Sequence, residues 1–336
     1  MITPGYSLTA PSKPLPVMAL DFTTAVTDAR VSTTRAGDTA TRINASGVIE
    51  IVNANLPRYD FDPVTLVCKG LLCESARTNL LLNSLIDGTN LATQSVTLSA
   101  IAYTLTFYGS GSVAISGGHT ATVTGAGNYP ARQTYTFTPT AGNSTFTVTG
   151  DVKYAQLEAG TYGTSFIPTA GTSVLRAADV STMTGTNFSS WYNATEGTFQ
   201  VVGSMNVSTT AVLQTFANVG DPNNDVQIFN NVSASRFRGD IYSGGALQRA
   251  FTYTGAGAPA ANTTYNIILG LKASDFAMAV NGNAPLIYAA GLMPVGPAAL
   301  YIGCTNLSTQ QLEGHVKRIA YYKQKLLNAE IQALSK

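Results

Sequence analysis

Charged residues are scarce in this chain of 336 residues: they make up 11% of it, whereas roughly 25% is usual for a globular protein. Lysine plus arginine (19) and aspartate plus glutamate (18) nearly cancel, which leaves a formal net charge of +1. Without an excess of one sign, no bulk field attracts nucleic acid or an acidic membrane surface. No stretch approaches the ~18 unbroken apolar residues of a membrane span. We therefore expect neither a nucleic-acid partner nor membrane insertion.

Cysteine and histidine are also rare, with three and two copies. Cys68, Cys73 and Cys304 are too few for a disulfide framework and lack the spacing of a zinc site, so we expect buried, reduced thiols. The first residues contain several prolines where a signal peptide would need a basic start and a long apolar run. We expect synthesis in a cytoplasm, without a signal peptide.

Strand-type sequence is abundant: Thr, Val, Ile, Tyr and Phe alternate over short runs separated by turn pairs. The spacing of these runs is typical of β-sandwiches rather than of βαβ units. The clearest runs are residues 103–108, 133–138, 145–149, 198–202, 265–271 and 276–280. The one convincing helix is predicted over residues 326–334, whose apolar positions share a face: Leu326, Leu327, Ile331 and Leu334.

The placement of charge divides the chain. Residues 1–85 hold clustered charges and little periodicity, which indicates an extended or irregular arm. No charged side chain occurs between Asp87 and Arg132, so residues 86–178 are expected to form a small β module that ends in a linker. Residues 179–336 form a third block. The predicted fold is all-β: two jelly-roll β-sandwiches in tandem behind an irregular N-terminal arm, with one short C-terminal helix.

Carboxylates in suitable pairs would be needed for glycoside hydrolysis. Asp60 and Asp62 are best explained as a turn cap before Pro63. Asp221 and Asp225 lie in a loop that is either a polar turn or a calcium site. No acidic residues alternate along a strand as they do in jelly-roll glucanases, so we assign no catalytic residue, and calcium is the only cofactor left open.

With no catalytic, zinc or nucleic-acid site indicated, the remaining possibility is a site that binds sugar by aromatic stacking. Sugar-binding sandwiches combine Trp or Tyr rings with hydrogen bonds from Asn, Asp and Gln. The candidate binding residues are Trp191, Tyr192, Asp221, Asn223, Asn224, Asp225 and Tyr242. Two of them have structural alternatives: Trp191 as a core or interdomain anchor, and Tyr242 as a partly exposed strand residue.

Ordered motifs then point to known modules. In the last block they are an opening strand at 196–202, a central hairpin at 265–282, and closing segments at 301–303, 312–322 and 326–331. This set resembles laminin-G-like and concanavalin A-like domains. Four upstream segments, 30–36, 40–47, 57–63 and 70–80, resemble an arm that recurs in bacteriophage virion proteins. Three more, 154–160, 164–169 and 176–179, resemble the close of carbohydrate-binding-module-like jelly rolls in the same proteins.

The resemblance implies a non-enzymatic structural protein on the virion surface, namely a head or tail fibre, a spike or a decoration subunit. Its arm would dock on capsid or tail proteins, and its C-terminal sandwich would bind a host-surface glycan. A homo-oligomer, such as a trimer, is expected. Two alternatives stay open: a capsid cement with a purely structural role, and a depolymerase that cleaves host polysaccharide.

Overall fold

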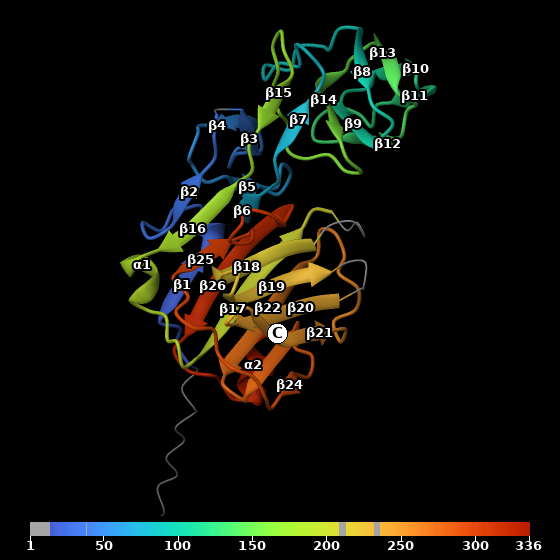
Figure 1. The fold of residues 1–336 in the computed structure, drawn as a ribbon. Coiled ribbons are helices and arrows are strands. Elements are labelled where there is room, and N and C mark those ends of the chain that lie inside the picture. Colours follow the sequence, from blue (N-terminus) through green and yellow to red (C-terminus); the bar gives the residue numbers. More distant parts are fainter. Residues whose placement is uncertain (1–13, 38, 208–212, 232–235) are drawn as a thin grey trace, which may run out of the picture.

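The protein consists of two β-sandwiches at opposite ends of an elongated molecule, as the computed structural model shows (Figure 1). The structure describes residues 14–37, 39–207, 213–231 and 236–336. The predicted all-β class is confirmed, because the described residues contain strands and only three short helical segments: η1 (Phe22–Thr24), α1 (Thr186–Ser189) and α2 (Asn328–Leu334). No helix in those residues is long and apolar enough to cross a lipid bilayer.

The large sandwich contains an eight-stranded and a seven-stranded antiparallel sheet. The eight-stranded sheet has the order β24-β23-β22-β17-β26-β6-β5, and β1 also pairs with β26. Its strands are β24 (Leu286–Tyr288), β23 (Phe276–Val280), β22 (Thr264–Lys272), β17 (Glu196–Met205), β26 (Gly314–Tyr322), β6 (Cys68–Cys73), β5 (Tyr59–Phe61) and β1 (Met18–Asp21).

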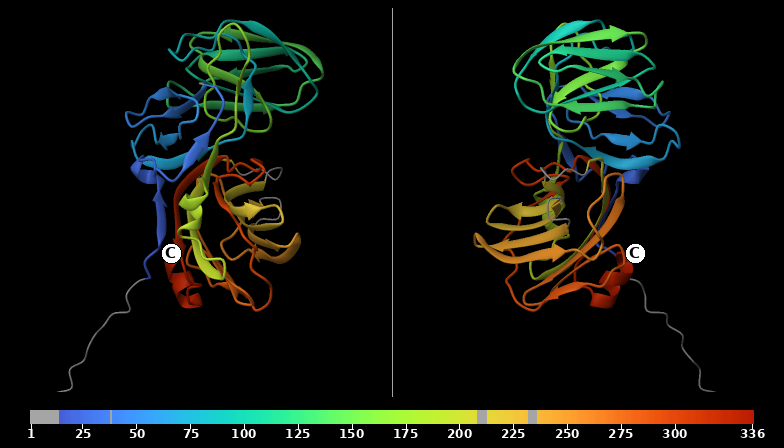
Figure 2. Two further views of the ribbon diagram at one scale, coloured as in Figure 1. Left: turned by 60° about the vertical axis from the view of Figure 1, so that its left-hand side comes forward. Right: turned by 90° about the vertical axis from the view of Figure 1, so that its right-hand side faces the viewer.

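The seven-stranded sheet has the order β2-β16-β25-β18-β19-β20-β21. Its strands are β2 (Ser32–Thr34), β16 (Val180–Thr184), β25 (Ala299–Ile302), β18 (Leu213–Asp221), β19 (Asn224–Asn231), β20 (Arg236–Ser243) and β21 (Ala246–Tyr253). Figure 2 shows the two sheets as separate layers. Inward-pointing apolar residues such as Phe199, Phe216 and Phe237 are fully buried between them, because side chains alternate along each strand.

Helix α2 covers the outer side of the eight-stranded sheet (Figure 2). Leu326 and Ile331 are buried there, and Leu334 packs against the same cluster. The predicted C-terminal helix is therefore confirmed, although it begins two residues after the expected start. The prediction for Leu327 was wrong: it immediately precedes the helix and is 70% exposed, so it lies outside the apolar face.

The N-terminal segment differs from the predicted irregular arm. Strands β1, β2, β5 and β6 are integral parts of the two large sheets, so residues 18–21, 32–34, 59–61 and 68–73 belong to the large sandwich. Met18 and Leu20 alternate with exposed neighbours and reach the core. These strands are only three to six residues long, and such short runs show little periodicity in sequence.

The small sandwich packs a four-stranded sheet, β11-β10-β13-β8, against a three-stranded sheet, β12-β9-β14. Its strands are β8 (Gln94–Leu98), β9 (Tyr103–Tyr108), β10 (Ser112–Gly117), β11 (Ala121–Thr124), β12 (Gln133–Phe137), β13 (Gly142–Thr149) and β14 (Lys153–Ala159). Buried residues such as Leu105, Val113 and Phe146 form its own core. The predicted strands in this region are confirmed.

Two small sheets connect the sandwiches: β7 (Arg77–Asn79) pairs with β15 (Val174–Arg176), and β3 (Ala40–Ile43) forms a hairpin with β4 (Ile49–Val52). Because β7 precedes the small sandwich and β15 follows it, the β7–β15 pair closes a loop that contains the whole module. The small sandwich is thus an insertion into the large one rather than a domain that follows an arm.

Candidate functional site

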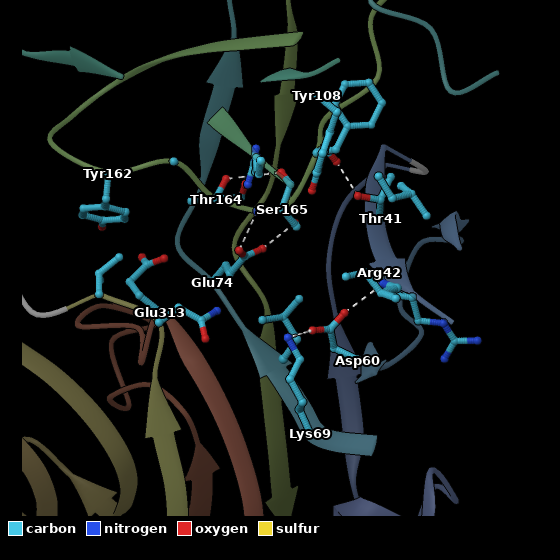
Figure 3. Close-up of a pocket in the computed structure, with 18 residues that line it drawn as sticks. Thr41, Arg42, Asp60, Lys69, Glu74, Tyr108, Tyr162, Thr164, Ser165 and Glu313 are labelled. Carbon is cyan, nitrogen blue, oxygen red and sulfur yellow. Dashed lines mark hydrogen bonds and ion pairs between the residues drawn. The ribbon is translucent and has the colours of Figure 1, made fainter. Parts of the chain in front are cut away.

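A cavity of about 200 Å³ lies where the two sandwiches and the β3–β4 hairpin meet. We call it the junction cavity (Figure 3). Its walls come from segments far apart in sequence: the hairpin, strands β5 and β6, the small sandwich, residues 162–166, and the large sandwich at residues 206–207 and 313. The inserted module therefore creates the cavity, since neither sandwich alone supplies all the walls.

A buried group of charged side chains fixes one side of the cavity. We call it the ionic cluster: Arg35, Arg58, Glu74, Arg176 and Asp179. Arg58 Nη2 lies 2.8 Å from Glu74 Oε2 and also contacts Asp179. Arg35 Nη1 donates to Asp179 Oδ1 at 3.0 Å, and Arg176 pairs with Glu74. All five residues are nearly fully buried. Their ion pairs join the segments on either side of the small sandwich, at Glu74 and at residues 176–179, to each other and to Arg35 and Arg58.

Ser165 links this cluster to the cavity wall. Its backbone N–H donates to Glu74 Oε1 at 2.7 Å, and its hydroxyl donates to Glu74 Oε2 at 2.6 Å. The Glu74 carboxylate thus has a hydrogen-bonding partner at each oxygen, and Figure 3 shows it pointing at Ser165. Its engagement makes Glu74 a structural anchor of the segment that carries Tyr162 and Thr164.

Asp60 occupies the opposite wall and is also fully engaged. It accepts hydrogen bonds from the backbone N–H of Ile43 at 2.8 Å, from Lys69 Nζ at 2.7 Å and from His315 Nε2 at 2.9 Å. Although burial opposes ionisation, these donors hold the pKa of Asp60 well below its usual range. Burial lowers the pKa of His315. The pair is therefore an ionised aspartate with a neutral histidine that donates its Nε2–H.

The wall formed by the small sandwich is held by Arg132. Its guanidinium donates to the backbone oxygen of Thr164 and to Thr106 Oγ1, both at 2.7 Å. It also lies 5.9 Å from the centre of the Tyr108 ring. Tyr108 and Thr164 are consequently held in place on the cavity surface, where Figure 3 shows them.

Tyr162 and Glu313 lie together at the side of the cavity that faces the large sandwich (Figure 3). The Arg77 guanidinium stacks 4.7 Å from the centre of the Tyr162 ring. Burial and the nearby negative charge of Glu313 raise the pKa of Tyr162 to about 12, so its phenol stays protonated and can donate a hydrogen bond. Glu313 Oε1 accepts from the backbone N–H of Ser75 at 3.0 Å, which orients its carboxylate.

The arrangement is suited to binding a small polar ligand. The cavity offers aromatic surface, donors and acceptors within a volume below the roughly 300–1,000 Å³ of a drug-sized site. An acid–base pair would need two carboxylates with contrasting pKa values facing the ligand. Among the described acids near the cavity, burial raises the pKa of Glu158, but this residue is fully buried and receives two hydrogen bonds from Thr164.

Trp191 and Tyr192, two of the predicted binding residues, lie in an aromatic cluster of the large sandwich. Trp191 is 3% exposed, and its indole Nε1 donates to the Asn187 oxygen at 2.7 Å. The Tyr192 ring stacks on Phe188 with centroids 4.9 Å apart. Trp191 is therefore a core residue, which was the structural alternative to a ligand-binding role. Neither Trp191 nor Tyr192 lines the junction cavity.

The other predicted residues are brought close together at one end of the seven-stranded sheet, away from the junction cavity. Asp221 Oδ1 caps its own turn by accepting from the backbone N–H groups of Asn223 and Asn224. Asn224 Oδ1 accepts from the Gly244 and Val295 N–H groups, and Gly245 donates to the Asn223 oxygen. The polar-turn alternative therefore describes this loop.

Asp225 and Tyr242 follow these turns on the sheet. Asp225 is 1% exposed and accepts from Asn218 and Gln227, and burial raises its pKa. Tyr242 is half-buried and lies on a strand, which agrees with the alternative that it is a partly exposed strand residue. No group of three or more His, Cys, Asp or Glu side chains that could hold a metal ion occurs in the described part of the chain. Cys68, Cys73 and Cys304 are free thiols; Cys73 and Cys304 are buried as expected, whereas Cys68 is only half-buried.

Sequence reasoning did not identify the junction cavity as a site. It treated Asp60 with Asp62 as a turn, and only Asp62 has that role, accepting from the Val64 and Thr65 N–H groups. The available signal was indirect: segments 57–63, 70–80 and 164–169, quoted above for their resemblance, all border the cavity. Three of their charged residues, Arg58, Asp60 and Glu74, are buried and paired rather than exposed.

No family model matches the chain, and no curated protein matches it. Partial likenesses to solved structures exist. The carbohydrate-binding module CBM40 of a Ruminococcus gnavus IT-sialidase has a TM-score of 0.35 and 14% identity over 42% of this chain and 83% of its own. A Trypanosoma rangeli sialidase in complex with the inhibitor DANA has a TM-score of 0.34 and 14% identity over 46% of this chain and 26% of its own. Likenesses of this degree carry no information about ligand or activity.

Proposed function

We propose that the protein is a non-enzymatic structural protein of a phage virion surface, a fibre, spike or decoration subunit, and that it binds a sugar unit of a host-surface glycan in the junction cavity. The observation that carries the glycan part is the pairing of a protonated Tyr162 with an oriented Glu313 carboxylate beside Lys69 and Thr164 in one polar cavity. Sugar hydroxyls both donate and accept, so they match such a mixed set of groups.

We propose a non-enzymatic role because the acidic residues near the cavity already have ion-pair and hydrogen-bond partners. Asp60 and Glu74 are held in ion pairs and multiple hydrogen bonds. A general acid needs a raised pKa and access to the leaving group. Asp60 has the opposite shift, and Glu158 is enclosed by Thr164.

The virion part rests on the sequence resemblance and is supported by the build of the molecule. The ionic cluster and the β7–β15 pair hold together the two segments that enter and leave the small sandwich. In Figure 1 the first described residues lie at the end of the large sandwich away from the small one. Attachment to a particle through the large sandwich would hold the small sandwich and the junction cavity away from it.

Glycan binding is tested by titrating host polysaccharide fragments into the full chain in a calorimeter. Glu313→Gln should weaken binding about tenfold or more, since a hydrogen bond that involves a charged group contributes ~1.5–3 kcal/mol. Tyr162→Phe removes a neutral hydrogen bond, which contributes ~0.5–1.5 kcal/mol, and should weaken binding roughly two- to tenfold. Tyr242→Phe is the matched control, because Tyr242 belongs to the other candidate region. A loss with Tyr242→Phe alone would move the site to the seven-stranded sheet. Steady release of reducing ends would favour a depolymerase instead.

The virion role is tested by locating the protein in an electron cryomicroscopy map of the particle. We expect density for the small sandwich at the outer end of the subunit. If no fragment binds and both sandwiches are clamped between capsid subunits, a purely structural cement is the correct function. Absence of the chain from purified particles would refute the virion role.

A further inference from the structure

The outer side of the four-stranded sheet in the small sandwich has an unusual composition. The strands β11, β10, β13 and β8 point their apolar residues, such as Val113, Ile115 and Phe146, into the module's core. The alternate positions point outward and carry only small neutral side chains. We call this surface the hydroxyl face: Ser95, Thr97, Ser112, Ala114, Ser116, Thr122, Thr124, Asn143, Thr145, Thr147 and Thr149.

Strand pairing arranges these residues in rows across the sheet. Thr122, Ala114 and Thr147 form one row, and Thr124, Ser112 and Thr149 form the next. On the other side of the centre, Ser116, Thr145 and Ser95 align, and the Ser95 and Thr145 hydroxyls lie 2.8 Å apart. All these residues are half-buried or exposed. The rows make a continuous polar surface without a charged or aromatic side chain at any of its positions.

The small sandwich has a second polar outer surface, on the three-stranded sheet, and this surface is covered by other parts of the chain. On the three-stranded sheet, Thr104, Thr106, Gln156 and Glu158 point outward, and each is no more than 1% exposed. The chain itself covers them: Gln156 contacts residues 164–167, and Glu158 binds Thr164. The polar face of the three-stranded sheet is therefore covered by the chain itself, whereas the hydroxyl face is not covered by any described part of the chain.

We propose that the hydroxyl face is a contact surface for the same face of a second copy of this chain. Charge complementarity supports this partner, because two copies of an uncharged face meet without the like-charge repulsion that excludes wrong partners. Every Ser and Thr hydroxyl is both a donor and an acceptor, so the face is complementary to itself in a two-fold contact.

The size of the face predicts a weak contact. Four strands about 4.8 Å apart, paired over about five residues of ~3.3 Å each, give roughly 300–400 Å² per copy. Two copies would bury less than the ~1,200 Å² at which stable interfaces begin. The face also has no aromatic anchor of the kind that dominates binding energy. The contact therefore becomes populated where neighbouring copies are held at the ~mM effective concentrations that tethering produces.

Sedimentation equilibrium of the full chain at concentrations up to about 1 mM tests this inference. The wild type should show a concentration-dependent dimer. Thr147 lies at the centre of the face, so Thr147→Lys and Thr147→Glu should each lower the association constant about tenfold or more. An equimolar mixture of the two variants should associate again, because only a face-to-face contact brings the opposite charges together. Thr134→Lys, at an exposed position on the three-stranded sheet, is the control and should behave as wild type.

Three results would overturn the proposal: a wild type that is monomeric at every concentration, a Thr147→Lys variant that associates as the wild type does, or a mixture of the two charged variants that stays monomeric. A neutral glycan is the competing occupant. If Thr147→Lys abolishes retention of the protein on dextran while the wild type remains monomeric, the face belongs to a glycan and not to a second copy. Circular dichroism of each variant confirms that it is folded.

Discussion

Replacing Glu74 by glutamine removes one negative charge from the ionic cluster with little change in side-chain size. Within the cluster, the three arginines Arg35, Arg58 and Arg176 face the two carboxylates of Glu74 and Asp179, so its formal charge is +1. The substitution raises this to +2 in a region that is almost inaccessible to water. Burial and the positive charge of Arg58 already lower the pKa of Arg176 to about 9, which shows that its charge is poorly solvated.

The expected loss of stability is large. Removing one partner of a buried ion pair costs about 3–5 kcal/mol, because the remaining charge stays buried without compensation. A glutamine at position 74 can keep its oxygen toward the donors that meet at Oε2, namely Arg58, Arg176 and the Ser165 hydroxyl. Its amide group would then face the Ser165 backbone N–H, which donates to Oε1 in the wild type. With a slope of about 3 kcal/mol per M urea, the unfolding midpoint should fall by roughly 1–1.7 M.

Trp191 provides the assay, since it is the only tryptophan and is buried in the core of the large sandwich. Urea unfolding is followed by its fluorescence and, in parallel, by far-ultraviolet circular dichroism, which reports both sandwiches. Glu50→Gln is the matched control: Glu50 pairs with Arg42 on the surface, where a salt bridge contributes about 0–1 kcal/mol. If Glu74→Gln costs no more than Glu50→Gln, the cluster does not hold the sandwiches together and our reasoning is refuted.

Three further predictions concern burial. First, stability should fall with acid below about pH 6.5, because the lowered pKa of His315 lets the unfolded chain take up a proton that the folded chain does not; His315→Gln should flatten urea midpoints measured between pH 7 and 5. Second, burial raises the pKa of Cys73 well above its usual range and raises the pKa of Cys304 to about 12, so neither thiol should react with Ellman's reagent at pH 8 until the protein is unfolded in urea. Third, Phe146→Ala should destabilise the small sandwich by about 3–5 kcal/mol, measured by thermal denaturation, because Phe146 is fully buried.

The fold class could be predicted because long strands carry their own signal. Residues 103–108 alternate two kinds of side chain, and the structure places β9 at the same residues. The strands of the N-terminal segment could not be recognised in this way. A run such as β1, with four residues, acquires its conformation from pairing with β26 about 300 positions later in the chain. Such pairing is a tertiary property that local periodicity does not contain.

The junction cavity could not be predicted for the same reason. Asp60 meets His315 across 255 sequence positions, and Glu74 meets Ser165 across 91. The sequence search favoured acids that lie near one another in the chain, and in the loop that contains Asp221 it found a turn. Strand pairing in the large sandwich brings Lys69 and His315 to Asp60, whereas Ser165 reaches Glu74 because the small sandwich is inserted between them in the chain.

The scarcity of charge has a distinct consequence at each end of the small sandwich. At the junction, charged side chains are buried in the ionic cluster, where they fix the module and are unavailable to the surface. On the hydroxyl face there are none, and surface charge is what normally keeps soluble proteins from associating. A substitution at an exposed strand position such as Thr147 usually changes stability by no more than about 0.5 kcal/mol. The fold should therefore tolerate a lysine there, so a change in association would be attributable to the contact itself.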